Sequence, residues 1–278
     1  MRGDQRVRRD AFLAKLNRRP IVMGILNVTP DSFSDGGQFE TADAALAHAR
    51  RLIEDGCDII DVGGESTRPG AIPVSADDEL QRIVPVLTRL AQETDATVSV
   101  DTSKAEVAAR AIELGAVLVN DVWGLQRDPA MAGTVADTEA AVVIMHNRAD
   151  KDDAIDIIAD IRRFFDRSLA LAVQAGIARS RIILDPGIGF AKTSRQNRDA
   201  LANLTALADY GLPIMVGVSR KRFLGSLGDG SEASLVGTVA VNLAAAAVGA
   251  SLFRVHDVAE HVAALRVFHT IRVGERGG

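Results

Sequence analysis

Residues 97–122 read TVSVDTSKAEVAARAIELGAVLVNDV, and this stretch determines the class of fold. It begins and ends with short β-branched runs, and between them residues 104–114 have the apolar spacing of a helix. Asp101 or Thr102 is placed to cap that helix, and Gly115 stands where it should end. A strand, a crossover helix and a second strand in this order predict a βα unit of a parallel sheet.

The same unit recurs along the chain. Strand candidates begin near residues 20, 58, 97, 117, 141, 182, 213 and 251. Helix candidates lie at residues 42–56, 76–92, 104–114, 129–138, 153–176, 196–209, 233–249 and 257–271. Eight units predict a single (β/α)8 TIM barrel over residues 20–278, with residues 1–19 as a short polar N-terminal extension. An open, doubly wound parallel sheet is the alternative architecture.

The composition is that of a globular protein with a large core. Of the 278 residues, 47% are hydrophobic and 25% are charged. The net charge of −5 gives no overall attraction to nucleic acid or to an anionic membrane. Residues 235–253 carry no charge, but Asn242 and Gly249 interrupt them, so we interpret them as a buried helix followed by a strand. The lone Cys57 and the lack of a secretory signal pattern favour the cytoplasm.

Every predicted strand leads to a polar side chain. In a TIM barrel the carboxyl ends of all strands converge on one rim, where the active site lies. Asp61, Glu65 and Asp121 fit a structural role as well as a functional one. The polar residues that follow the strands are Asn27, Asp61, Glu65, Asp101, Asn120, Asp121, His146, Asp185, Ser219, Lys221, Arg254 and His256.

Common local motifs do not account for these residues. Residues 187–193 resemble a phosphate loop, but Gly189 and Lys192 are three apart, whereas the Walker motif needs adjacent residues. Paired cysteines and an HExxH pattern are both missing from the sequence, which excludes the usual zinc sites. Two long loops, residues 28–39 and 63–70, combine glycines with Phe33, Phe39 and Arg68, and we predict that they are lids over a substrate.

Seven blocks of sequence resemble the dihydropteroate synthase family. They are GILNVTPDSFSDGG, DVGGESTRPGA, VDT, VNDVWG, DPGIGFAKT, GVSRKRFLG and FRVHDV, in the family's order from Gly24 to Val258. The resemblance implies a TIM-barrel transferase of folate biosynthesis, usually a homodimer that uses Mg²⁺. Such enzymes join 6-hydroxymethyl-7,8-dihydropterin pyrophosphate to p-aminobenzoate and release pyrophosphate. The resemblance also implies inhibition by sulfonamides, which mimic p-aminobenzoate.

The resemblance also assigns roles to individual residues. It implies catalytic roles for Asp35, Lys221, Asp101 and Asp185. Pterin contacts are implied for Asp101, Asn120, Met145, Asp185 and Lys221. Pyrophosphate contacts are implied for Asn27, Arg68, Arg254 and His256, with Asn27 as the protein ligand of Mg²⁺. The implied p-aminobenzoate contacts are Phe33, Thr67, Arg68, Pro69, Phe190, Ser219, Lys221 and Arg222. Many relatives carry serine where Arg222 stands, which leaves the contact to the p-aminobenzoate carboxylate open.

Three other functions remain as alternatives. A methyltetrahydrofolate-dependent corrinoid methyltransferase shares the barrel and the pterin contacts, but it has no use for a pyrophosphate site. A Schiff-base aldolase would use Lys221 as its nucleophile. A non-catalytic pterin-binding paralogue would keep the binding residues without turnover. For the synthase we expect small-molecule substrates and a dissociative route, in which Asp35 stabilises a methylene cation and Phe33 excludes water.

Overall fold

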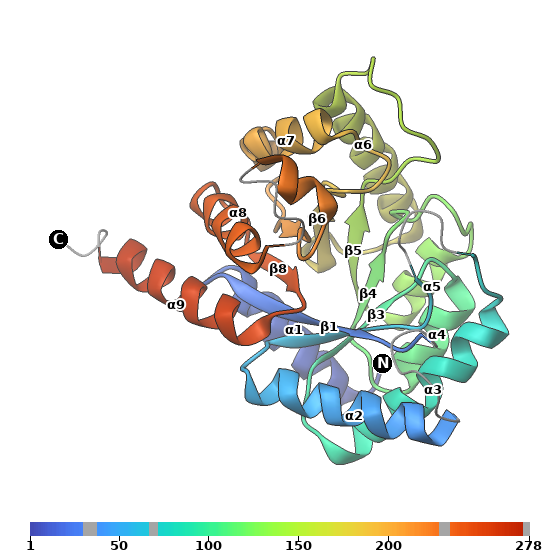
Figure 1. Ribbon diagram of the computed structural model, residues 1–278. Helices are drawn as coiled ribbons and strands as arrows, with labels where there is room; N and C mark the ends of the chain where they lie inside the picture. Colours follow the sequence, from blue (N-terminus) through green and yellow to red (C-terminus); the bar gives the residue numbers. More distant parts are fainter. Residues whose placement is uncertain (30–37, 67–71, 228–233, 275–278) are drawn as a thin grey trace.

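Parallel strands alternate with helices in a computed structural model that describes residues 1–29, 38–66, 72–227 and 234–274 (Figure 1). The strands are β1 (Ile21–Asn27), β2 (Ile59–Gly63), β3 (Val98–Asp101), β4 (Leu118–Asp121), β5 (Ala141–Met145), β6 (Ile182–Asp185), β7 (Met215–Val216) and β8 (Leu252–Val255). The α-helices are α1 (Gly3–Leu16), α2 (Gln38–Glu54), α3 (Ala76–Glu93), α4 (Ala105–Glu113), α5 (Met131–Thr138), α6 (Ile157–Ala175), α7 (Ser194–Ala202), α8 (Leu235–Ala247) and α9 (Val258–Gly274). Short 3₁₀ helices are η2 (Arg179–Arg181), η3 (Leu204–Tyr210) and η4 (Arg222–Leu227).

The eight strands form one closed parallel sheet. Its order is β6-β5-β4-β3-β2-β1-β8-β7, and β6 and β7 meet through a parallel bridge between Leu184 and Ile214. All strands run in the same direction, and strands that are consecutive in the sequence are joined through helical crossovers that lie outside the sheet. The predicted (β/α)8 TIM barrel is therefore confirmed, and the open sheet is wrong.

Local sequence signals explain where the helices begin and end. Asp156 caps α6 by accepting hydrogen bonds from the backbone N–H groups of Ile158 and Ala159. Gly176 ends α6 with φ of 83°, a left-handed conformation that favours glycine. The single helix predicted over residues 196–209 is instead α7 followed by η3, because Asn203 between them bonds back to the Asp199 carbonyl.

The uncharged segment 235–253 forms a helix and a strand, as predicted. It contains α8 and β8, which are separated by the turn around Gly249. Among the described residues, no helix combines the length and the apolar character that crossing a membrane requires.

The interior of the barrel has an apolar lower layer at the amino ends of the strands. Ile21, Met23 and Leu252 belong to this layer, which packs against Phe12 and Leu16 of α1. Gln5 of the same helix donates a buried hydrogen bond to the Ile112 carbonyl at 2.7 Å. Residues 1–19, for which the sequence predicts only a polar extension, thus contain a helix that covers the amino-terminal end of the barrel. This apolar layer leaves the opposite end for polar side chains.

Candidate active site at the carboxyl ends of the strands

Four polar side chains enter the barrel from four of its strands. Asp61, Asp101, Asn120 and Asp185 are each 4% exposed or less, and they come from β2, β3, β4 and β6. Asp101 is in register with Asn120 on β4, so both side chains leave the sheet at the same level. Met145 ends β5, between β4 and β6, and is also buried. The predicted pterin-binding residues of these strands therefore share one end of the barrel.

Arg254 of β8 links two of these carboxylates. Its Nε lies 2.6 Å from Asp61 Oδ2, and its Nη2 lies 2.7 Å from Asp101 Oδ2. Asn120 Nδ2 also donates to Asp61 Oδ2, at 2.9 Å. Although burial opposes it, the charges of Asp61 and Asp101 raise the pKa of Arg254. Burial raises the pKa of Asp101 to about 7, with the charge of Arg254 opposing the shift.

Three acceptor atoms of this cluster are buried without a hydrogen-bond partner among the described residues. They are Asp61 Oδ1, Asp101 Oδ1 and Asn120 Oδ1. An unpaired buried acceptor costs about 1–3 kcal/mol, so native proteins rarely keep one. Three together at the active-site end of a TIM barrel indicate a binding site for a ligand that presents N–H groups.

Asp185 and Lys221 both contact the loop that follows β6. Asp185 Oδ1 accepts a hydrogen bond from Gly187 N at 2.7 Å, and burial raises the pKa of its carboxyl. Lys221 Nζ donates to the Ile188 carbonyl and lies 4.6 Å from the centre of the Phe190 ring. Burial lowers the pKa of Lys221 to about 8, and the charge of Asp185 opposes the shift. The loop therefore brings Phe190 and Lys221 together, as both predicted roles in p-aminobenzoate binding require.

Ser219 and His256 meet beside the charged cluster. Ser219 Oγ accepts a hydrogen bond from His256 N at 3.1 Å and lies 3.0 Å from His256 Nδ1. His256 comes directly after β8, two residues beyond Arg254, so both side chains lie at the carboxyl end of the same strand. The structure thus joins Ser219, predicted for p-aminobenzoate, to a residue predicted for pyrophosphate.

The donor set around Asn27 fits only a weakly held metal ion. Asn27 ends β1, and its Oδ1 lies close to Gly63 on the neighbouring strand. Within the described ranges no group of three His, Cys, Asp or Glu side chains is arranged to hold a metal. An amide oxygen suits a hard ion such as Mg²⁺, which commonly takes its other ligands from water and from substrate phosphates.

Several predicted site residues lie outside the described residues. They are Phe33, Asp35, Thr67, Arg68 and Pro69, together with the side chain of Arg222.

Sequence reasoning undervalued two sets of buried residues. Asp61, which we considered equally suited to a structural role, is the acceptor shared by Arg254 and Asn120. The signal was available, because a carboxylate in the middle of an otherwise apolar five-residue strand needs a buried partner. Lys192 and His146 form a second buried pair, 2.8 Å apart beneath the β6–α7 loop. No spacing rule connects these two residues, since they are 46 positions apart.

Comparison with known proteins agrees with this geometry. A profile of pterin binding enzymes matches residues 23–256. The fold and this match together define the class: a pterin-binding enzyme built on a (β/α)8 barrel.

Individual relatives narrow the class to one family. The dihydropteroate synthase of Bacillus subtilis is 46% identical over 241 residues, which cover 86% of this chain and 84% of that protein. The structure of Xanthomonas albilineans dihydropteroate synthase with 4-aminobenzoic acid superposes with a TM-score of 0.87 and 46% identity, covering 91% of this chain and 93% of that one. The Yersinia pestis enzyme in a sulfonamide drug complex gives a TM-score of 0.84 and 44% identity, covering 93% and 96%. The chain belongs to the dihydropteroate synthase family.

Proposed function

We propose that this protein condenses 6-hydroxymethyl-7,8-dihydropterin pyrophosphate with p-aminobenzoate to give 7,8-dihydropteroate and pyrophosphate. The observation that carries the proposal is the set of unpaired buried acceptors on Asp61, Asp101 and Asn120 in a chain of this family. A pterin ring presents N–H groups along one edge, and these acceptors are of the kind that would pair with them.

The flat pterin would lie between the strands that carry the polar cluster. Asp101, Asn120 and Asp185 would bind its donor edge, while Met145 would pack on its face. Lys221 would donate to a ring acceptor, and its position beside Ile188 and Phe190 supports this role. Because water has little access to these side chains, each hydrogen bond to the ring acts in a medium of low dielectric constant.

The pyrophosphate would lie toward Arg254 and His256. Arg254 is already held between Asp61 and Asp101, so it would present a fixed positive charge to the leaving oxygen. Ser219 holds His256 and supports it at the same end. We also assign Asn27 and Arg68 to pyrophosphate binding. Asn27 would offer an oxygen that can coordinate Mg²⁺, and Arg68 would add a second positively charged side chain. Mg²⁺, when bound there with the substrate, would neutralise charge that develops on pyrophosphate.

The carbon–oxygen bond would break before the amine attacks. The electron-rich dihydropterin delocalises the methylene cation, and Asp35 would stabilise it electrostatically while Phe33 excludes water. The amine of p-aminobenzoate then attacks the methylene carbon and loses a proton. Phe190, Lys221, Thr67, Pro69, Arg222 and Ser219 would bind p-aminobenzoate, whose carboxylate an arginine can pair.

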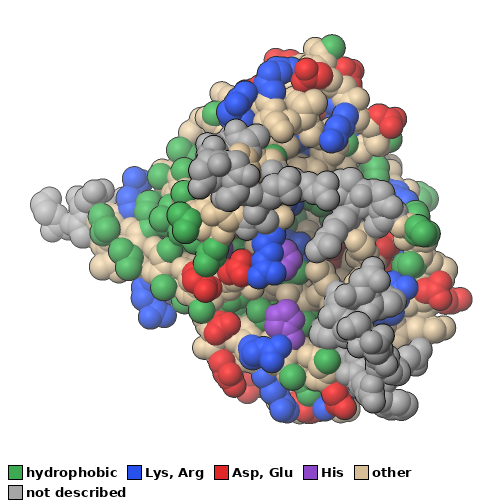
Figure 2. Space-filling view, viewed as in Figure 1, with side chains coloured by type: hydrophobic (Ala, Val, Ile, Leu, Met, Phe, Trp, Pro, Cys, Tyr) green, Lys and Arg blue, Asp and Glu red, His purple; other side chains and the backbone are tan. Residues whose placement is uncertain are grey.

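Exposed apolar side chains support a homodimer. Val236 of α8 and Val267 and Ile271 of α9 are each more than half exposed. Figure 2 shows hydrophobic side chains gathered over the side of the molecule where Figure 1 places these two helices. An apolar patch on neighbouring helices is typical of an interface between identical subunits. The free Cys57 is consistent with a reducing compartment, and we place the reaction in the cytoplasm.

The direct test supplies the purified protein with Mg²⁺ and both substrates. Chromatography should detect dihydropteroate in equal amount to the pyrophosphate released. Folded protein that binds the pterin pyrophosphate without forming product would instead indicate the non-catalytic paralogue. Methyl transfer to a corrinoid protein would favour the methyltransferase, and borohydride trapping of Lys221 with a carbonyl substrate would reveal an aldolase.

A further inference from the structure

Lys192 is a buried lysine for which the proposed mechanism has no role. It lies in the β6–α7 loop, residues 186–193, and only 2% of its surface is exposed. Its Nζ lies 2.7 Å from the Gly187 carbonyl oxygen, 3.2 Å from the Phe190 carbonyl oxygen and 2.8 Å from His146 Nδ1. Burial lowers the pKa of Lys192 to about 7, so below that pH the three acceptors match the three N–H bonds of its ammonium group.

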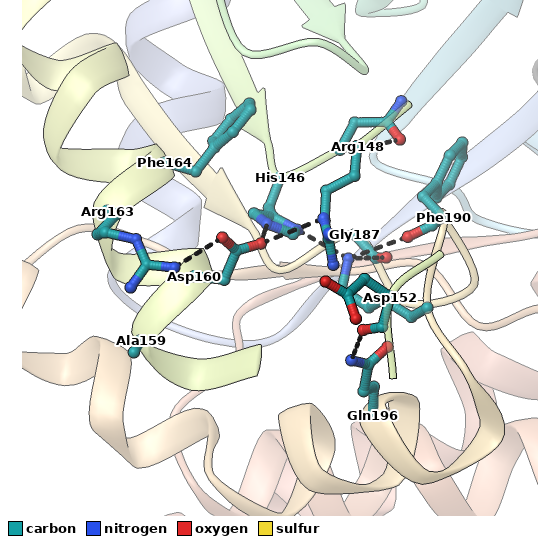
Figure 3. A network of polar contacts seen from close by, with 12 residues as sticks. His146, Arg148, Asp152, Ala159, Asp160, Arg163, Phe164, Gly187, Phe190 and Gln196 are labelled. Carbon is teal, nitrogen blue, oxygen red and sulfur yellow. Dashed lines mark hydrogen bonds and ion pairs between the residues drawn. The ribbon is translucent and has the colours of Figure 1, made fainter. Parts of the chain in front are cut away.

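The hydrogen atoms of this contact can be assigned from the far side of His146. The imidazole is fully buried, and burial lowers the pKa of His146 to about 2, so the ring is neutral. Its Nε2 lies 3.2 Å from Asp160 Oδ2, and Asp160 also pairs with Arg148 and Arg163 (Figure 3). An ionised carboxylate only accepts hydrogen bonds, so Nε2 carries the hydrogen and Nδ1 keeps its lone pair. Lys192 is therefore the donor to His146.

The β6–α7 loop has a conformation that needs such support. Gly187, Gly189 and Ala191 have φ angles of 66°, 88° and 41°, all in the left-handed region. For alanine this conformation costs about 1–2 kcal/mol. A Cβ atom at Gly187 would lie 1.9 Å from the His146 carbonyl oxygen, so the loop also passes close to the end of β5. The hydrogen bonds from Lys192 to the loop carbonyls therefore stabilise a backbone conformation that is unfavourable on its own.

Another carbonyl of the same loop contacts the proposed p-aminobenzoate site. The Ile188 carbonyl accepts from Lys221, whereas the carbonyls of Gly187 and Phe190 accept from Lys192. The Phe190 ring lies under the Lys221 ammonium group. The loop is thus bound by two lysines through different carbonyls, and a shift of its backbone would change the position of Phe190 relative to Lys221.

We propose that Lys192 is a positioning residue for p-aminobenzoate: by binding the carbonyls of Gly187 and Phe190 it fixes the spacing between Phe190 and Lys221. His146 and Asp160 orient the ammonium group from behind. This inference rests on the function proposed above. Of the proposed pterin contacts, Asp101 and Asn120 come from β3 and β4 and do not touch the loop, whereas Asp185 and Lys221 each make one hydrogen bond to its backbone. Phe190, which is proposed for p-aminobenzoate alone, is part of the loop itself. Loss of Lys192 should therefore affect p-aminobenzoate much more than the pterin.

The test compares Lys192→Met, which keeps the length of the side chain without its donors, with Lys151→Met at an exposed lysine of the preceding loop. Steady-state kinetics at about pH 6 would give KM for each substrate, and circular dichroism would check folding. We expect Lys192→Met to raise KM for p-aminobenzoate about tenfold, and KM for the pterin less than about threefold, since one or two hydrogen bonds are lost. Lys151→Met should match the unmodified protein. A purely structural role would lower the melting temperature and leave both KM values unchanged, which would refute the proposal.

A second pair of variants tests the contact from the other partner. Asparagine at position 146 keeps an oxygen acceptor near the place of Nδ1, whereas leucine removes it. His146→Asn should keep KM for p-aminobenzoate within about threefold of the unmodified protein, and His146→Leu should raise it as Lys192→Met does. Equal KM values in the two variants would overturn the inference even if Lys192→Met does not fold. Lack of turnover in the unmodified protein would instead refute the proposed function.

Discussion

Asp185 offers the most direct test of the proposed pterin site. Its side chain is 3% exposed at the end of β6, and its Oδ1 accepts a hydrogen bond from Gly187 N at 2.7 Å. In Asp185→Asn the amide oxygen can keep that bond, so the β6–α7 loop should retain its conformation. The amide nitrogen, however, replaces a charged acceptor by a donor. The variant therefore changes the contact to the pterin edge while preserving the local backbone.

The expected loss of pterin affinity has two causes: a hydrogen bond is lost, and two donors are left facing each other. A hydrogen bond to an ionised carboxylate contributes about 1.5–3 kcal/mol, and a donor left facing another donor costs about 1 kcal/mol more. A total of about 3 kcal/mol corresponds to a roughly 150-fold weaker affinity for the pterin pyrophosphate. Because Asp101 and Asn120 remain, binding should be weakened and not abolished.

Calorimetric titration with the pterin pyrophosphate measures this loss directly. Arg222→Ala is the matched control, because we place Arg222 at the p-aminobenzoate end, and it should change pterin affinity by less than about threefold. Both variants should have the melting temperature of the unmodified protein within a few degrees. Equal losses of pterin affinity in the two variants would show that the division of the site between the two substrates is wrong.

Four further outcomes are expected. If bond breaking precedes attack, the pterin pyrophosphate should release pyrophosphate slowly without p-aminobenzoate, and complete dependence on the amine would contradict that order. A sulfonamide should raise KM for p-aminobenzoate without lowering kcat; a lowered kcat at saturating p-aminobenzoate would argue against a shared site. Phe12→Ala should cost about 3–5 kcal/mol in urea unfolding, because Phe12 packs in the lower layer, yet leave both KM values unchanged. Burial raises the pKa of Asp101 to about 7, so the folded protein binds a proton that the unfolded chain releases near pH 4. Stability should therefore fall by up to about 1.4 kcal/mol per pH unit between those values, and Asp101→Asn should reduce that slope in urea unfolding.

The fold was predictable because its signals are local and repeated. Each strand is buried on both faces, so it appears as a continuous apolar run, and positive-φ glycines such as Gly115 and Gly176 end the helices before strands. The covering helix α1 was missed, because its buried side chains, Gln5, Phe12 and Leu16, are few among many charges. Its packing depends on the lower layer of the barrel, which no pattern within residues 1–19 reveals.

The sequence predicted which residues lie at the site better than it predicted which of their side chains contact one another. The rule that polar residues follow parallel strands placed Asp101, Asn120 and Asp185 correctly at one end of the barrel. The rule cannot say which side chains touch, since Arg254 lies 193 positions from Asp61 and 153 from Asp101. The pairing of Lys192 with His146 was hidden for the same reason. Contacts across a barrel depend on strand register and closure, which emerge only when the sheet is formed.

The two layers inside the barrel explain how a buried site can stay incompletely paired. Each unpaired acceptor on Asp61, Asp101 and Asn120 lowers the stability of the free protein by about 1–3 kcal/mol. The apolar layer below them, closed by Phe12 and Leu16, supplies burial that offsets this cost. A ligand that donates to these acceptors recovers on binding the free energy that the free protein lacks. In the proposed function, the atoms that weaken the free barrel are the ones that would give the pterin its affinity, and a sequence that paired them internally would gain stability and bind that ligand less tightly.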